Sequence, residues 1–180
     1  MTPGSQSIVW SQMDSPIGPL TLVASHHGLC HIMFSRKNAP TLGLQMWLNN
    51  WFPNPRLQRH DQELQPYITQ LEEYFNKERR EFDLPIDLYG TPFQKMVWRY
   101  LRTIPYGEVR SYKEVAQGIG APKAVRAVGG ANNKNPVSIV IPCHRVIGSN
   151  GSLVGYGGGL HIKEYLLTLE GWLKPNNEHK

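Results

Sequence analysis

Apolar and polar positions alternate along much of the first 35 residues, the spacing typical of half-buried strands. Apolar side chains occupy every second position over 20–24 and again over 30–34. A Pro- and Gly-rich cluster at 15–19 and a glycine at position 28 are typical of turns. An earlier apolar stretch begins at Ile8. The pattern therefore predicts three strands connected as an antiparallel meander.

The spacing then changes to that of helices. Apolar residues within 44–51 indicate a short helix, and a stripe at helical intervals predicts a longer one over 64–75. Residues 79–90 form a charged connector that contains proline and glycine and ends at Tyr89-Gly90. We place a domain boundary there, which divides the chain into domains at 1–90 and 91–180.

Helix start signals dominate the second half. Thr91-Pro92-Phe93-Gln94 and Ser111-Tyr112-Lys113-Glu114 both have the spacing of a capping box, in which two side chains satisfy the free amides of a helix N-terminus. A third helix is predicted over about 123–131, after a Gly-containing link, and a closing helix over 162–169. Two short helices joined by a tight turn fit a helix-turn-helix.

Charge is unevenly distributed between the two halves. Residues 1–90 hold 7 Lys/Arg and 9 Asp/Glu, a net charge of −2, whereas residues 91–180 hold 12 and 5, a net charge of +7. The basic half is the one expected to meet a polyanion, although a generic basic surface would look the same. No apolar run approaches the roughly 20 residues that span a membrane. With two cysteines and no signal peptide pattern, a cytoplasmic protein is expected.

The strongest chemical signal is one cysteine and its neighbours. A β-branched run at 137–141, predicted to be a buried strand, leads directly into Pro142-Cys143-His144-Arg145. Nearby cationic or basic groups lower the pKa of a thiol, and a buried carboxylate such as Glu170 can orient the histidine. The alternative is a core cysteine beside a surface His-Arg pair.

These residues resemble the acceptor-cysteine motif of the O6-alkylguanine-DNA alkyltransferases (methylated-DNA–protein-cysteine methyltransferases). Further matching segments follow in the family's order across the second half: Thr91-Pro92-Phe93-Gln94, Ile104-Pro105-Tyr106-Gly107-Glu108-Val109, Ser111-Tyr112, Ala127-Val128-Gly129-Gly130-Ala131, Asn135-Pro136, Lys163-Glu164 and Glu170-Gly171. The first half resembles the family only through Asp14-Ser15-Pro16-Ile17-Gly18.

The resemblance implies the fold class and the activity. The fold would be α/β (α+β) with two domains: an N-terminal antiparallel sheet with helices (RNase H-like) and a mostly helical C-terminal winged helix-turn-helix domain with a short wing-like hairpin. The protein would flip the damaged base and move the alkyl group from O6-alkylguanine, and from O4-alkylthymine, to Cys143 in a single turnover. It would act as a monomer on double-stranded DNA through the minor groove, with no cofactor and no membrane.

The resemblance also implies a role for each matching residue. Cys143 would accept the alkyl group, with His144 as its base through a water, Glu170 as orienter of the histidine and Asn135 as support for the cysteine loop. Tyr112 would push on the phosphate and donate to the leaving base, while Arg126 would fill the vacated space in the duplex. The other DNA contacts would be Ser111, Ala124, Ala127, Gly129, Gly130 and Ala131, and the base pocket would be lined by Pro142, Val146, Tyr156, Gly157 and Gly158.

The small side chains of the third helix have two interpretations. Ala124, Ala127 and Ala131 fall on one face, which would relieve crowding in a minor groove. Close packing against a neighbouring helix would select the same residues. Gly157 stands where some relatives have a serine, which would let a Gly-rich pocket admit bulkier alkyl groups.

Rival functions make different demands on the sequence. A lesion sensor that flips bases without repairing them would lack Cys143. A simple regulator would not require the Pro-Cys-His-Arg segment, and a thiol hydrolase would need an acyl-binding cleft that no segment indicates. The cluster of His26, His27, Cys30 and His31 suggests zinc, but the family's ligand set is not reproduced, and we expect no metal.

Overall fold

The computed structural model describes residues 6–34, 42–156 and 158–175, which form two compact units, 1–89 and 90–180. The N-terminal unit is built on a sheet of β1 (Gln6–Met13), β2 (Leu20–Ser25), β3 (Gly28–Phe34) and β4 (Pro55–Arg59) in the order β3-β2-β1-β4. The first three strands pair antiparallel, which confirms the predicted meander. The fourth was not predicted and pairs parallel with β1.

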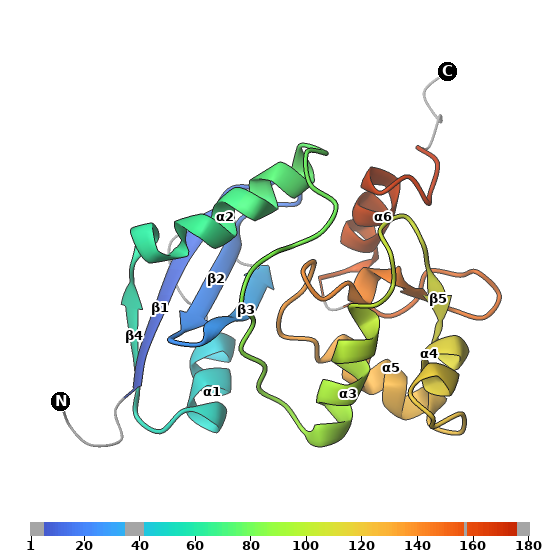
Figure 1. Cartoon of the computed structure of the whole chain (residues 1–180), viewed down its shortest axis with the longest axis horizontal. Coiled ribbons are helices and arrows are strands. Elements are labelled where there is room, and N and C mark those ends of the chain that lie inside the picture. Colours follow the sequence, from blue (N-terminus) through green and yellow to red (C-terminus); the bar gives the residue numbers. More distant parts are fainter. Residues whose placement is uncertain (1–5, 35–41, 157, 176–180) are drawn as a thin grey trace. The chain divides into compact units, whose positions relative to one another are not determined.

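Two helices cover the sheet on opposite faces (Figure 1). α1 (Leu42–Trp51) inserts Leu44 and Leu48 into a core with Ile8, Trp10 and Val23. α2 (Asp61–Phe75) buries its apolar stripe on the other face. Strand alternation gives β1 two different faces, and the helices bury both.

The predicted connector is fixed to the sheet edge. Leu29 of β3 donates to the carbonyl of Pro85 and accepts from the amide of Asp87, so the connector continues the sheet beside β3. Gly28 makes this approach possible: its φ is +144°, and a Cβ there would lie 2.5 Å from the Pro85 oxygen.

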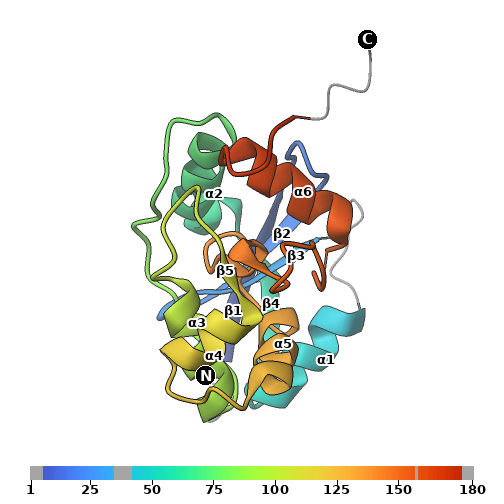
Figure 2. The same cartoon turned by 90° about the vertical axis from the view of Figure 1, so that its right-hand side faces the viewer.

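The C-terminal unit packs short helices around the cysteine segment (Figure 2). They are α3 (Pro92–Leu101), α4 (Tyr112–Gly118), α5 (Val125–Asn133) and α6 (Leu160–Leu169), with the 3-10 turn η1 (Cys143–Arg145). Both predicted capping boxes are present, from Thr91 to Gln94 and from Ser111 to Glu114. α5 packs against α3 and α4, and Trp98 Nε1 donates to the carbonyl of Ala131 at 2.8 Å.

Two predictions for this unit were wrong. Residues 137–141 are buried as expected, but they form a tight turn rather than a strand: Ile141 donates to the carbonyl of Val137, and Ile139 has a φ of +76°. The predicted wing-like hairpin is not found among the described strands of the unit, whose one strand pair, β5 (Arg110–Ser111) with β6 (Val146–Ile147), is parallel. A run rich in β-branched residues indicates that the segment is buried, but a buried segment need not have an extended backbone.

None of the helices in the described residues is long and apolar enough to cross a membrane.

The edge contact of Gly28 can be tested by substitution. Gly28→Ala should lower the free energy of unfolding by roughly 2–4 kcal/mol, because the new Cβ combines an unfavourable φ with a backbone clash. Gly18→Ala is the control, since Gly18 also has a positive φ, +103°, but open space around it. Its loss should be about 1–2 kcal/mol, from the positive φ alone. Urea denaturation measures the free energy of unfolding of both variants. If both lose the same amount, the contact with Pro85 adds no cost of its own.

Candidate functional site

Cys143 lies at the start of η1, between the tight turn and β6. Its side chain is 3% exposed, and its amide donates to the carbonyl of Ile141 at 2.8 Å. Burial raises the pKa of the Cys143 thiol, while Asn135, Lys163 and Ser138 act in the opposite direction. At neutral pH the buried side chain is therefore a thiol, and a reaction as a nucleophile requires a base.

Asn135 holds the turn that delivers the cysteine. Its Nδ2 donates to the carbonyl of Ile141 at 2.8 Å, and its Oδ1 accepts from the amide of Val137 at 3.0 Å. One side chain thus bridges both ends of the turn that contains the positive φ of Ile139. A β-branched residue takes that conformation only when its surroundings impose it.

Glu170, the residue that ends α6, binds both residues that follow the cysteine. His144 Nε2 lies 2.7 Å from Glu170 Oε2, and Arg145 donates to the same carboxylate through Nε at 2.8 Å and Nη2 at 3.0 Å. The amide of Gly107 also donates to it, at 3.3 Å. Although burial opposes ionisation, His144 and Arg145 hold the pKa of Glu170 far below its usual range.

The ionised carboxylate decides which nitrogen of His144 is basic. A carboxylate accepts hydrogen bonds, so Nε2 carries the proton and Nδ1 is left with a lone pair. Burial lowers the pKa of His144 despite the opposing effect of Glu170, so the ring is neutral at pH 7. Nδ1 is buried and has no hydrogen-bond partner among the described residues. A neutral imidazole held in this orientation, on the residue that follows the buried thiol in the chain, is suited to accept its proton.

Comparisons with known proteins address both units. Residues 8–88 match the model of the 6-O-methylguanine DNA methyltransferase ribonuclease-like domain, and residues 92–172 match that of the DNA binding domain of the same family. The chain belongs to the 6-O-methylguanine DNA methyltransferase family.

Individual relatives cover nearly the whole chain. A methylated-DNA–protein-cysteine methyltransferase of Methanosarcina acetivorans is 46% identical over 158 residues, 88% of this chain and 95% of that protein. A crystal structure of Mycobacterium tuberculosis O6-methylguanine methyltransferase is 44% identical, with a TM-score of 0.75 over 94% of this chain and 96% of that one. Mycobacterium tuberculosis OGT in complex with DNA is 47% identical, with a TM-score of 0.72 over 91% and 92%. The expected family and fold class are confirmed.

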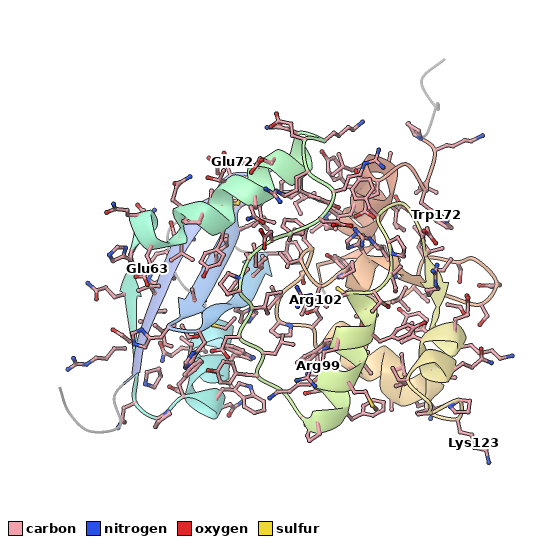
Figure 3. All side chains as sticks on the ribbon, viewed as in Figure 1. Glu63, Glu72, Arg99, Arg102, Lys123 and Trp172 are labelled. Carbon is pink, nitrogen blue, oxygen red and sulfur yellow. The ribbon has the colours of Figure 1, made fainter. Side chains whose placement is uncertain are left out.

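The predicted DNA contacts of this methyltransferase family member lie mainly on α5 and at the start of α4. Arg126, Ala127 and Gly130 are exposed, whereas Ser111, Tyr112, Ala124 and Gly129 are partly buried. Ala131 differs: it is 3% exposed and faces the core beside Trp98, so its small size serves helix packing. Exposed basic side chains also occur elsewhere in this unit: Arg99 lies on α3, Arg102 just after it and Lys123 in the link before α5 (Figure 3).

The predicted pocket residues come from two segments. Pro142 and Val146 are buried on either side of η1, and Tyr156 and Gly158 are partly buried in the loop before α6. Gly157 lies outside the described residues. The Tyr112 hydroxyl reaches the second segment, where it donates to the carbonyl of Val154 at 2.7 Å.

Sequence reasoning missed two buried polar residues of the site. Lys163 of α6 is fully buried and donates to the carbonyls of Val146 and Val154, and burial lowers its pKa to about 8. Asn132 of α5 is 2% exposed and donates to the carbonyl of Cys143 at 3.4 Å. Lys163 lay in a quoted family segment, but one helical lysine gives no sign of burial, and neither does one asparagine.

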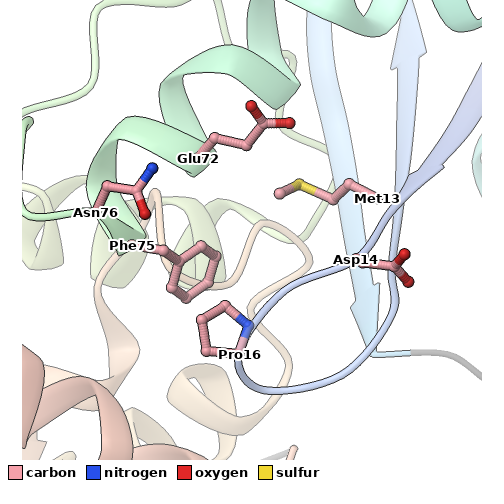
Figure 4. A pocket seen from close by; sticks show the side chains of 6 residues that line it. All are labelled: Met13, Asp14, Pro16, Glu72, Phe75 and Asn76. Carbon is pink, nitrogen blue, oxygen red and sulfur yellow. The ribbon is translucent and has the colours of Figure 1, made fainter.

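The histidine and cysteine cluster of the N-terminal unit does not converge. Cys30 Sγ donates to the carbonyl of Val23 in the core, and His31 packs on Trp47 with ring centroids 4.7 Å apart, while His26 and His27 are exposed. The unit does contain a surface pocket between the β1–β2 turn and the end of α2 (Figure 4). Met13, Asp14, Pro16, Glu72, Phe75 and Asn76 line it, and none is a predicted site residue.

The carboxylate of Glu170 should contribute strongly to stability. Glu170→Gln leaves Arg145 buried without its counter-charge, so the free energy of unfolding should fall by roughly 3–5 kcal/mol. Glu164→Gln, at an exposed position of the same helix, should change it by less than about 0.5 kcal/mol. Urea denaturation at pH 7 measures both. If both substitutions lower the free energy of unfolding by the same amount, the buried contacts of Glu170 contribute no more to stability than an exposed charge does.

Proposed function

We propose that this protein repairs DNA by transferring the alkyl group of O6-alkylguanine to its own Cys143. The observation that carries the proposal is the buried thiol followed directly by a histidine whose Nε2 is bound to Glu170 and whose Nδ1 has no partner among the described residues. Membership of the family, and the DNA binding domain matched by residues 92–172, supply the substrate class.

The chemistry is an in-line displacement at the alkyl carbon. The Cys143 thiol gives its proton to His144 Nδ1, through a water in the scheme that the family resemblance implies. The sulfur forms a bond to carbon as the bond from carbon to O6 breaks, and the electron pair leaves with the base. Tyr112 donates a hydrogen bond to that departing base. The product is a thioether with no easy route back, so each molecule acts once and needs no cofactor.

Reaching the alkyl carbon requires the base to leave the stack. Extrusion costs a few kcal/mol of unstacking, which a side chain inserted into the gap can offset. Arg126 is exposed on α5 and fits that role, with Ala127 and Gly130 allowing close approach to the minor groove. Ser111, Tyr112, Ala124 and Gly129 would complete the contact with a duplex bound by a monomer.

The remaining assignments follow from position. Asn135 supports the cysteine turn, and Pro142, Val146, Tyr156, Gly157 and Gly158 would line the base pocket. The C-terminal domain, 91–180, would perform DNA binding and alkyl transfer, and the N-terminal domain, 1–90, would support it. O4-alkylthymine would be a second substrate.

Mass spectrometry tests the transfer directly. Mixing the protein with a duplex that contains one O6-methylguanine should add one methyl mass per molecule, located on the peptide that contains Cys143. Cys30→Ala should still gain the methyl, whereas Cys143→Ala should not. Binding of the duplex without any gain in mass would contradict the proposal and favour a lesion sensor.

The pH dependence of transfer tests the role of His144. The base must be neutral to accept the thiol proton, so the single-turnover rate should fall on acidification. Because burial lowers the pKa of His144, the midpoint should lie below its usual value of 6.5. Saturating DNA, verified by binding at each pH, separates this effect from affinity. A rate that keeps rising up to pH 9 would show instead that ionisation of the thiol controls the reaction.

A further inference from the structure

Lys163 of α6 is a fully buried lysine without a carboxylate beside it. None of the ion pairs among the described residues includes it. Nζ donates to the carbonyls of Val146 and Val154 and lies 5.9 Å from the centroid of the Tyr112 ring. An uncharged side chain of similar length would fill the same space without the cost of burying an amine. What the lysine adds is its hydrogen bonds to two carbonyls and its charge.

The Val154 carbonyl accepts from two side chains at once. The Tyr112 hydroxyl donates to it at 2.7 Å and Lys163 Nζ at 3.0 Å. A carbonyl oxygen has two lone pairs, so it can hold both donors together. If one donor leaves, the other still pairs the carbonyl. Lys163 also donates to Val146 of β6, so it ties the loop that contains Val154 to the strand that follows η1.

The Tyr112 hydroxyl is occupied in this structure. A hydroxyl has one hydrogen to donate, and its shorter contact is with Val154, since the Gly155 carbonyl lies 3.4 Å away. In the proposed reaction the same hydrogen is donated to the departing base. The bond to Val154 must therefore break before Tyr112 can act. A carbonyl that lost its last donor in this step would oppose it.

We infer that Lys163 is a positioning residue for Tyr112: because Lys163 keeps the Val154 carbonyl paired, the tyrosine hydroxyl can leave that carbonyl for the damaged base at little cost. This role rests on the proposed function and deepens it. Lys163 itself touches neither the base nor the alkyl group, and no proton passes through it. Its effect on the rate of transfer should therefore disappear when Tyr112 has no hydroxyl to release.

A double-mutant cycle on the rate of methyl transfer tests this coupling. Lys163→Met has a similar length but no donor and no charge. It should slow single-turnover transfer at saturating duplex by about tenfold, because the Val154 carbonyl is then left unpaired when Tyr112 leaves. In the Tyr112→Phe protein the same substitution should slow transfer by about twofold or less. The duplex concentration that gives half the maximal rate should change little in either background.

The neighbouring position of α6 provides the control. Glu164→Gln, at an exposed site, should leave the rate unchanged in both backgrounds. Equal slowing by Lys163→Met with and without the tyrosine hydroxyl overturns the inference, since the lysine would then only support the fold. An effect confined to the half-saturating duplex concentration overturns it as well, since the lysine would then act on binding.

The release of Tyr112 can also be observed without a substitution at Lys163. Valine labelled with ¹³C at its carbonyl, combined with ¹⁵N-labelled glycine, marks only the Val128–Gly129 and Val154–Gly155 peptide bonds. When the Cys143→Ala protein binds a duplex that contains O6-methylguanine, the Val154 carbonyl resonance should move toward its position in the free Tyr112→Phe protein. A resonance that stays in place overturns the inference, even if Lys163→Met fails to fold.

Failure of the inference and failure of the proposed function are distinguishable. A wild-type protein that gains no methyl on Cys143 contradicts the proposed function. The Val154 resonance still reports whether Tyr112 leaves in that case, because it requires binding and no transfer. Methyl transfer by a protein whose Val154 resonance does not move contradicts the role of Lys163 alone.

Discussion

The site depends on one buried anion. Glu170 accepts from His144, from two nitrogens of Arg145 and from the amide of Gly107, and Arg145 also donates to the carbonyl of Ile104. A buried carboxylate is stable only when an opposite charge and hydrogen-bond donors replace the water that it has lost. The end of α6, the loop at 104–107 and η1 are thereby held at one point. The histidine ring acquires its tautomer and its orientation from the same contacts.

A fixed histidine is useful only if the cysteine beside it is fixed as well. The turn at 137–141 bends the chain sharply into η1, with Ile139 in a conformation that its branched side chain disfavours. Asn135 bridges the ends of the turn, and burial of its apolar side chains offsets the local cost. The unfavourable φ of Ile139 therefore occurs only four residues before Cys143, in the turn that leads the chain into η1.

Local signals in the sequence were sufficient for some elements and misleading for others. Both capping boxes and the alternation at 20–34 predicted their elements because those interactions involve residues close in sequence. β4 has no alternating pattern and exists through its pairing with β1, a contact between distant segments. The run at 137–141 and the alanine at 131 report burial correctly, but composition does not specify backbone shape or which partner covers a small side chain. The cysteine motif was evident from the sequence, whereas Lys163 and Asn132 became visible only through their burial.

The buried polar atoms of the site fall into two groups, those with hydrogen-bond partners and those without. Lys163 donates to the carbonyls of Val146 and Val154, and Glu170 is surrounded by donors; these groups maintain the shape of the site. His144 Nδ1 and Asn132 Oδ1 are both buried acceptors without a partner in the described chain. The proposed transfer needs an acceptor for the thiol proton. His144 Nδ1 belongs to the residue that follows Cys143, so the contacts of Glu170 with Nε2 leave one acceptor for the thiol proton that the proposed transfer removes.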